Sequence, residues 1–302
     1  MKTLLRGDPA YPELLERIAQ PPPLLHVIGR LELLAGPAVA IVGTRRPSSE
    51  GALFAERLAA DLAARGIVVV SGLAYGIDAA AHRGALATGA TLAVLASGAD
   101  VPSPVGNADL YRRIAARGAV VSEFPAGTGA RAFQFLQRNR IISGISLGTV
   151  VVEAPAKSGA LVTARHAAEQ DREVFAVPGS PLREGSAGPN ALLKDGACLV
   201  RGWEDVVREL RLGGDPPASA LEAAGGPGQR LAGGIEPGHA GYRPESAPGR
   251  GDVLRLLGAA PKHVDELLAE SGRGVAELLS ELGELEVLGS VRQHPGKFFS
   301  RG

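Results

Sequence analysis

The chain has 302 residues, and its 32 basic residues balance its 32 acidic residues, so a nucleic-acid partner would have to meet a local basic patch. Its single cysteine, Cys198, excludes an internal disulfide and a cysteine-rich metal site. No apolar run reaches the roughly 18 residues that a membrane span needs, and the N-terminus turns polar too early for a secretory signal. We therefore expect a cytoplasmic protein without a membrane partner.

From residue 38 onward, short apolar runs alternate with helix-length segments. The runs are continuous and rich in β-branched residues, as expected of strands buried on both faces. The first helical segment begins at two possible capping residues, Ser48 and Ser49, and ends at Gly66. The alternation predicts a Rossmann-like, doubly wound and mostly parallel α/β sheet over residues 36–212. The predicted strands lie at 39–43, 67–72, 91–97, 119–124, 149–154 and 174–179.

Three further parts are predicted around this domain. Residues 1–35 form a short lead-in, in which the stretch HVIGRLELL can add an edge element. Residues 213–250 are dense in glycine, proline and alanine, which predicts a flexible tether. Residues 251–302 show three short helical patterns and two strand-like runs around a Pro-Gly pair, the outline of a small winged-helix domain. Its acids outnumber its bases, so we expect it to contact protein, or to touch DNA only through a wing that carries Arg292 and Lys297.

The loops that follow the predicted strands carry glycine, serine and basic side chains. The carboxyl ends of parallel strands lie along one edge of a sheet, where helix N-termini present backbone N–H groups that favour anions. Each loop alone is equally consistent with a surface turn that carries solvated side chains. Together they predict a continuous anion-binding edge formed by Gly43, Thr44, Arg45, Arg46, Ser71, Gly72, Tyr75, Lys157, Ser158, Gly159, Thr163, Asn190 and Lys194.

The stretch 131–166 concentrates positive charge, with five basic residues against the single acid Glu153. Phe133 and Phe135 accompany these charges. Unpaired nucleic-acid strands need cations for their phosphates and aromatic faces for their bases, so the stretch favours single-stranded DNA. Scattered surface arginines with core phenylalanines remain the alternative. The basic residues are Arg131, Arg138, Arg140, Lys157 and Arg165, with Asn139 between two of the arginines.

Common nucleotide-binding motifs are missing from the expected places. The first strand is not followed by G-x-G-x-x-G, and Gly296-Lys297 lacks the glycine and the strand that a P-loop requires upstream. Asp78 is well placed to cap the next helix, and His82 is more often a satisfied buried residue than a base. We therefore expect no enzymatic activity and no metal or other cofactor.

Five stretches resemble the DNA-processing protein A (DprA/Smf) family over residues 9–210. They are AIVGTRRPSSEG, VVSGLAYGIDAAAH, FLQRNRIISG, VVVEAPAKSGALVTARHAAEQDREVFAVPGS and GPNALLKDGA. The resemblance implies a homodimer that binds single-stranded DNA, protects incoming strands during natural transformation and loads the recombinase RecA onto them.

The resemblance also implies which side chains contact DNA. The family's motif arginines fall on Arg45, Arg138 and Arg140, and its motif lysine falls on Lys157. A loop asparagine and the lysine after it fall on Asn190 and Lys194. The family usually has arginine where this chain has Tyr75, whose ring could stack on a base instead.

The main alternative is a nucleotide phosphoribohydrolase of the lysine-decarboxylase-like group, which shares a Rossmann-like scaffold. That chemistry needs P-G-G-x-G-T-x-x-E, and the nearest stretch here, KSGALVTARHAAE, lacks the glycine pair and the correctly spaced acid. A third possibility is a protein-interaction adaptor whose basic edge is incidental.

Overall fold

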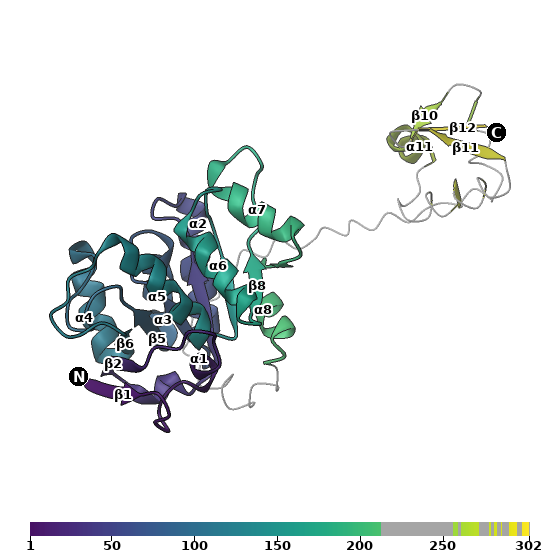
Figure 1. Ribbon diagram of the computed structural model, residues 1–302. Coiled ribbons are helices and arrows are strands. Elements are labelled where there is room, and N and C mark those ends of the chain that lie inside the picture. The colour runs from purple at the N-terminus through teal and green to yellow at the C-terminus, as the bar shows by residue number, and fades with distance from the viewer. Residues whose placement is uncertain are drawn as a thin grey trace, which may run out of the picture. The chain divides into compact units, whose positions relative to one another are not determined.

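The computed structural model describes residues 1–212, 256–258, 261–271, 278, 281, 282, 285, 290–294 and 298–301. The chain divides between Gly226 and Pro227 into two compact units, and each is described by itself (Figure 1). The tether predicted at 213–250 lies outside the described residues. Within the described part, no helix is both long enough and apolar enough to cross a membrane.

The first unit is built on a nine-stranded sheet with the order β1-β2-β6-β5-β4-β3-β7-β8-β9. The seven strands from β6 to β9 in this order pair in parallel, and β1 and β2 join antiparallel at one edge. This topology confirms the predicted doubly wound sheet. The strands are β1 Lys2–Leu5, β2 Leu24–Gly29, β3 Ala38–Val42, β4 Val68–Ser71, β5 Thr91–Val94, β6 Ala119–Ser122, β7 Gly148–Val151, β8 Glu173–Ala176 and β9 Cys198–Leu199.

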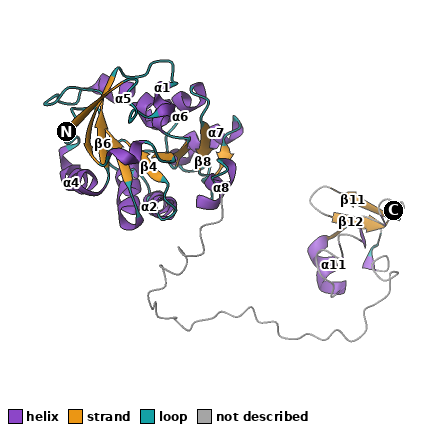
Figure 2. Cartoon of the chain, turned by 90° about the horizontal axis from the view of Figure 1, so that it is seen from below, coloured by secondary structure: helices purple, strands orange, loops and turns teal. Residues whose placement is uncertain are grey.

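Helices cover both faces of the sheet. Figure 2 shows α1, α5 and α6 on one side of the strands and α2 and α4 on the other. The helices are α1 Glu13–Glu16, α2 Ser49–Ala63, α3 Ile77–Thr88, α4 Ala108–Arg117, α5 Ala132–Ile145, α6 Gly159–Glu169, α7 Ala187–Lys194 and α8 Trp203–Glu209. Three short 3-10 turns lie at Leu31–Leu34, Val105–Asn107 and Glu184–Ser186.

The central strands are continuously apolar because both of their faces are covered. Every residue of β3, β4, β5, β6 and β7 is buried. Ser48 caps α2 as predicted, since its hydroxyl accepts a hydrogen bond from the backbone N–H of Gly51 at 3.0 Å. Cys198 packs beside the core cluster on the α2 face, as its apolar neighbours predicted.

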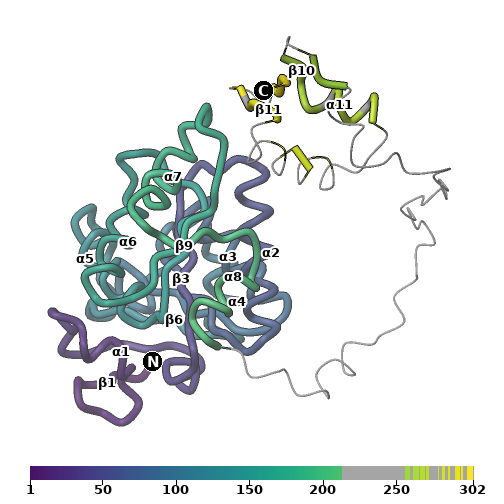
Figure 3. Tube along the Cα trace, turned by 90° about the vertical axis from the view of Figure 1, so that its right-hand side faces the viewer, coloured from purple at the N-terminus to yellow at the C-terminus, as the bar shows by residue number. Residues whose placement is uncertain are grey.

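The N-terminal segment belongs to the sheet. β2 pairs antiparallel with β6, and Figure 3 shows the purple N-terminal segment beside that end of the domain. Leu15 and Leu25 are fully buried in the core, and full burial of a leucine side chain is worth about 1.5–3 kcal/mol. The HVIG part of the predicted edge element is therefore a paired strand that extends the sheet.

The described residues of the second unit form a three-stranded sheet and one helix. β11 Val291–His294 and β12 Phe298–Arg301 form the predicted antiparallel hairpin, with β10 Lys262–His263 on the other side of β12. Leu267 of α11 Val264–Ser271 and Phe299 of β12 are buried together in the core of this unit. Most of the first and third predicted helices, and the Pro-Gly turn, lie outside the described residues.

Candidate nucleic-acid interface

The strand order reverses between β3 and β7, and ligands of open parallel sheets bind at the carboxyl side of such a point. The loop after β3 and the loop after β7 meet there, because the Thr44 N–H donates to the carbonyl of Glu153 at 2.6 Å. The loops after β4 and β8 flank them. Four neighbouring loops therefore lie along the predicted edge.

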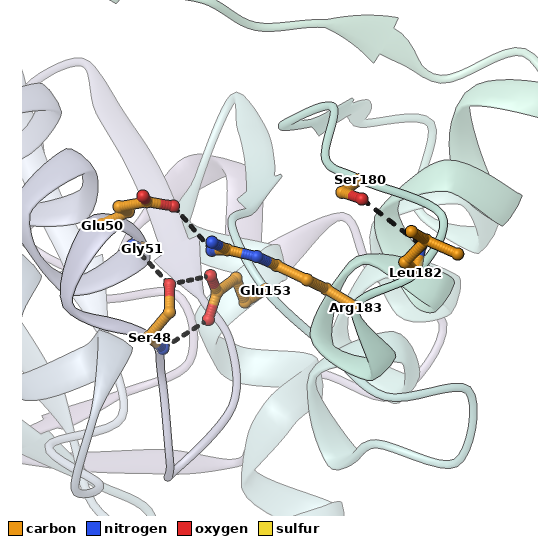
Figure 4. Close-up of polar contacts among 7 residues, drawn as sticks. All are labelled: Ser48, Glu50, Gly51, Glu153, Ser180, Leu182 and Arg183. Carbon is orange, nitrogen blue, oxygen red and sulfur yellow. Dashed lines mark hydrogen bonds and ion pairs between the residues drawn. The ribbon is translucent and has the colours of Figure 1, made fainter.

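The helix N-terminus at this point already holds a carboxylate. Glu153 Oε2 accepts from the Ser48 N–H at 2.8 Å, and its other oxygen accepts from the Ser48 hydroxyl (Figure 4). A Cβ on Gly51 would lie 2.5 Å from Glu153 Oε1, so glycine makes room for this side chain. The N-terminus of α2, where a phosphate cradle was one interpretation, is therefore filled by the protein's own anion. No local sequence pattern indicates this role of Glu153.

The loop after β4 is held from beneath by a buried charge pair. Asp78 Oδ2 accepts from the N–H groups of Gly72 at 3.1 Å and Ala74 at 3.3 Å, so it caps this loop rather than the helix it was expected to cap. Arg138, which is only 4% exposed, donates to the carbonyls of Gly72, at 2.8 Å, and Val94. Burial lowers the pKa of Arg138 to about 10, and Asp78 opposes that shift. The same burial raises the pKa of Asp78.

Arg138 is therefore not available to a phosphate, contrary to our expectation. The reason is visible in helix α5, where Arg138 shares a buried face with Ile141, Ile142 and Ile145. A side chain on that face points at the sheet. The Arg138 guanidinium instead stabilises the loop after β4 through its hydrogen bond to the Gly72 carbonyl.

Arg140 is also committed within the protein. Its guanidinium forms an ion pair with Glu123 at 2.7 Å, and the side chains of both residues are largely shielded from solvent, at 13% and 8% exposure. The pair joins Arg140 of α5 to the residue that directly follows β6, so the charge of Arg140 is already compensated within the protein. Arg140 is therefore a weaker candidate for a phosphate contact than the exposed Arg45.

Four smaller predicted contacts are buried as well. The Ser71 hydroxyl donates to the Ile41 carbonyl at 2.7 Å, and the Asn139 amide donates to the Gly159 carbonyl at 3.2 Å. Gly72 lies against the Arg138 guanidinium, and Thr163 is 2% exposed within α6. The side chains of Ser71 and Asn139 are thus bonded to backbone carbonyls, and all four residues are buried.

An aromatic and cationic surface does lie open at the edge. The Arg45 guanidinium lies 5.3 Å from the centroid of the Phe135 ring, so the loop after β3 contacts the start of α5. Arg45 and Arg46 are exposed, as are Phe133 at 60% and Tyr75 at 48%. We call these five residues the aromatic edge.

The loops after β7 and β8 continue the surface in part. Lys157 is exposed beside Ser158, whose hydroxyl accepts from the Ala160 N–H at 3.3 Å at the start of α6. The Asn190 side chain bonds both the N–H and the carbonyl of Gly179, at 3.2 and 2.9 Å, and so fixes the loop after β8. Lys194 is exposed, but it lies in the last turn of α7, which runs away from the carboxyl edge.

His82 is a buried structural residue, as the sequence favoured. Its Nδ1 lies 2.7 Å from the Thr91 hydroxyl, and burial lowers its pKa to about 3. The ring is therefore neutral at physiological pH.

Comparisons with known proteins show the family of this chain. The family model described as DNA recombination-mediator protein A matches residues 2–211. The chain belongs to this family. A second model, the DprA winged helix domain, matches residues 239–297, so the predicted winged-helix domain is confirmed.

Individual members of the DNA recombination-mediator protein A family are similar over most of the chain. The Synechocystis protein Smf is 36% identical over 99% of this chain and 79% of its own. The crystal structure of Streptococcus pneumoniae DNA processing protein A matches with a TM-score of 0.67 and 42% identity, over 69% of this chain and 74% of the other. The Helicobacter pylori protein, solved to describe its single-stranded DNA binding mode, matches with a TM-score of 0.64 and 30% identity, over 70% and 95%.

Proposed function

We propose that this protein binds single-stranded DNA along the carboxyl edge of its sheet, with little sequence preference and without covalent chemistry. The observation that carries the proposal is the exposed Arg45 guanidinium against the Phe135 ring, with two further exposed aromatic side chains, Phe133 at the start of α5 and Tyr75 in the loop after β4. The name of the Helicobacter pylori relative supports the same ligand. We infer that Lys157 extends the binding surface.

The composition of the aromatic edge matches the chemistry of an unpaired strand. Exposed cations attract phosphates, and aromatic faces stack on bases whose π surfaces are accessible only when they are unpaired. Stacking is worth about 1–3 kcal/mol per base and does not depend strongly on base identity. A duplex hides these faces, so single strands are the preferred ligand.

The residues at the point where the strand order reverses do not support the phosphoribohydrolase alternative. A nucleotide monophosphate bound there would place its phosphate at the N-terminus of α2, where the Glu153 carboxylate already accepts from Ser48. A phosphate and a carboxylate at the same helix N-terminus would repel each other at a large electrostatic cost. We infer a binding protein rather than an enzyme.

The biological setting follows from the family resemblance. We propose that the protein acts in the cytoplasm as a homodimer, protects incoming strands during natural transformation and loads RecA onto them. Residues 1–35, 36–212, 213–250 and 251–302 remain our proposed division into lead-in, DNA-binding domain, tether and winged-helix domain. We propose Asn190 as a loop-fixing residue and leave Lys194 outside the edge.

Titration of the full chain with a fluorescently labelled oligothymidine tests the function. If Arg45, Arg46 and Lys157 each neutralise one phosphate, log affinity should fall against log salt with a slope of roughly −2, from about 0.7 per contact on single strands. Duplex DNA of equal length should bind more weakly. A slope near zero, or equal affinity for both ligands, would contradict the proposal.

A further inference from the structure

A cavity of about 380 Å³ opens at the carboxyl edge of the sheet, where β7 and β8 end against the start of α2. Its volume is at the lower end of the range for small-molecule sites, about 300–1,000 Å³, and suits a single nucleoside. The loop after β8 forms one wall and α2 forms the other. Figure 4 shows the polar residues of this region around Glu153.

The polar side of the cavity carries two carboxylates and one guanidinium, from Glu50, Glu153 and Arg183. Glu50 and Arg183 form an ion pair at 2.6 Å, which leaves the Glu153 carboxylate as the charge that is not paired with a cation among the lining residues. An ionised carboxylate offers about four lone-pair positions, and the two Ser48 donors use only two of them. The free positions accept hydrogen bonds, so the cavity disfavours a phosphate and favours a ligand that presents N–H donors.

Both walls also carry apolar side chains. Phe54 of α2 lines the cavity together with Val177 and Pro178 of the loop after β8. Apolar and aromatic walls with a few placed polar groups are what proteins use to hold an extruded base by its Watson–Crick edge. Ser180, in the loop after β8, also lines the cavity. Its hydroxyl accepts a hydrogen bond from the Leu182 N–H at 3.3 Å.

We propose that this cavity receives one base of the bound strand and prefers guanine. Guanine presents two adjacent donors, N1–H and the N2 amino group, which match the two oxygens of one carboxylate; thymine presents a single N–H between two carbonyls. The route is short, because Arg45 of the aromatic edge precedes Ser48 by three residues in the same loop. The inference rests on the proposed function and adds a base preference at one position.

The experiment compares oligothymidines that differ at one central position. With the full chain, a single dG should bind about tenfold more tightly than dT, as expected for charge-assisted hydrogen bonds to a carboxylate partly offset by ordering of the strand. Deoxyinosine, which lacks the N2 amino group, should lose most of that gain. A single dG per oligomer also prevents guanine quadruplexes.

Two variants locate the preference. Glu153→Gln replaces one acceptor by a donor and should bring the dG-to-dT affinity ratio close to one. Because that change also alters the α2 cap, Ser180→Trp provides an independent test by filling the cavity. Leu182→Trp is the matched control, since Leu182 is 94% exposed on the same loop and does not line the cavity. It should keep the full ratio.

The outcomes separate the two proposals. Equal binding of dG and dT by the wild-type protein overturns the base preference while leaving single-stranded DNA binding intact. A preference that persists in Ser180→Trp places guanine elsewhere and also overturns the inference. Failure to bind any oligothymidine contradicts the proposed function itself. Binding of free deoxyguanosine without a dG effect in the strand would overturn the assignment to a strand base.

Discussion

Asp78 and Arg138 hold opposite sides of Gly72: the Asp78 carboxylate accepts its N–H at 3.1 Å, and the Arg138 guanidinium donates to its carbonyl at 2.8 Å. Both side chains are buried, so neither charge is compensated by water. Three residues further along this loop, Tyr75 is exposed on the aromatic edge. The pair therefore positions a proposed stacking residue without touching a ligand.

We predict that Arg138→Met destabilises the protein by about 3–5 kcal/mol, because it leaves Asp78 as an uncompensated buried charge. Urea denaturation measures the loss. Under conditions where the variant is folded, its affinity for oligothymidine should fall while the salt slope stays at the wild-type value. A slope reduced by about 0.7 with unchanged stability would mean that Arg138 contacts a phosphate after all.

Arg45→Ala should behave in the opposite way to Arg138→Met, with unchanged stability and a reduced salt slope. Its side chain is exposed, so the free energy of unfolding should change by less than about 0.5 kcal/mol. The salt slope should lose about 0.7, the contribution of one phosphate contact on a single strand. Arg57→Ala is the control, because Arg57 is equally cationic and 84% exposed on α2 but lies two turns beyond the helix start. A similar slope change in both variants would show that the effect is not specific to the edge.

The contrast between Arg45 and Arg138 shows what could be predicted from the sequence. The alternation of apolar runs was enough to predict the sheet, because strands that are buried on both faces consist mostly of apolar residues. Charge alone could not separate an exposed arginine from a buried one. Helical spacing could have done so, since Arg138 lies three, four and seven residues before Ile141, Ile142 and Ile145 on one face of α5.

Glu153 illustrates a second limit of prediction from the sequence. It was counted as the one acid that diluted a basic stretch, yet it fills the helix N-terminus at the point where the strand order reverses. That role depends on the pairing of β3 with β7, which joins residues more than 100 positions apart, as the separation of 105 between Ser48 and Glu153 shows. Long-range pairing of this kind is not encoded in any local spacing.

Phe135→Leu should weaken oligothymidine binding about tenfold, since leucine keeps the apolar bulk but removes the π face for a base and for Arg45. The salt slope should be unchanged, because no charge is removed. Fluorescence anisotropy at several salt concentrations measures both quantities. A loss that disappears at low salt would indicate an electrostatic effect and contradict the stacking role.

Tyr75→Arg adds a cation to the proposed aromatic edge, in the loop after β4. Tyr75 is 48% exposed, so the substitution should be tolerated, and the salt slope should become steeper by about 0.7. Binding should therefore improve most at low salt. Tyr75→Phe is the matched control, because it keeps the ring and adds no charge, and its slope should equal that of the wild type. An unchanged slope in Tyr75→Arg would place residue 75 away from the strand.

His82 should make the stability of the protein depend on pH. In the folded protein, burial keeps the pKa of His82 near 3, whereas its ordinary value is 6.5. Between these two values the unfolded chain binds a proton that the folded protein does not, so stability falls as the pH falls below 6.5 and is fully present above it. The loss is about 1.4 kcal/mol per pH unit, or roughly 2 kcal/mol by pH 5.

The variant His82→Gln cannot take up this proton, so the difference in unfolding free energy between the two proteins isolates the effect from other titrating groups, including the raised pKa of Asp78. Between pH 7 and pH 5, urea titrations should show the wild type losing about 2 kcal/mol more than the variant. Parallel curves would mean that His82 is accessible to protons in the folded protein. In that case the packing of its ring against Thr91, at the start of β5, would be looser than the 2.7 Å contact implies.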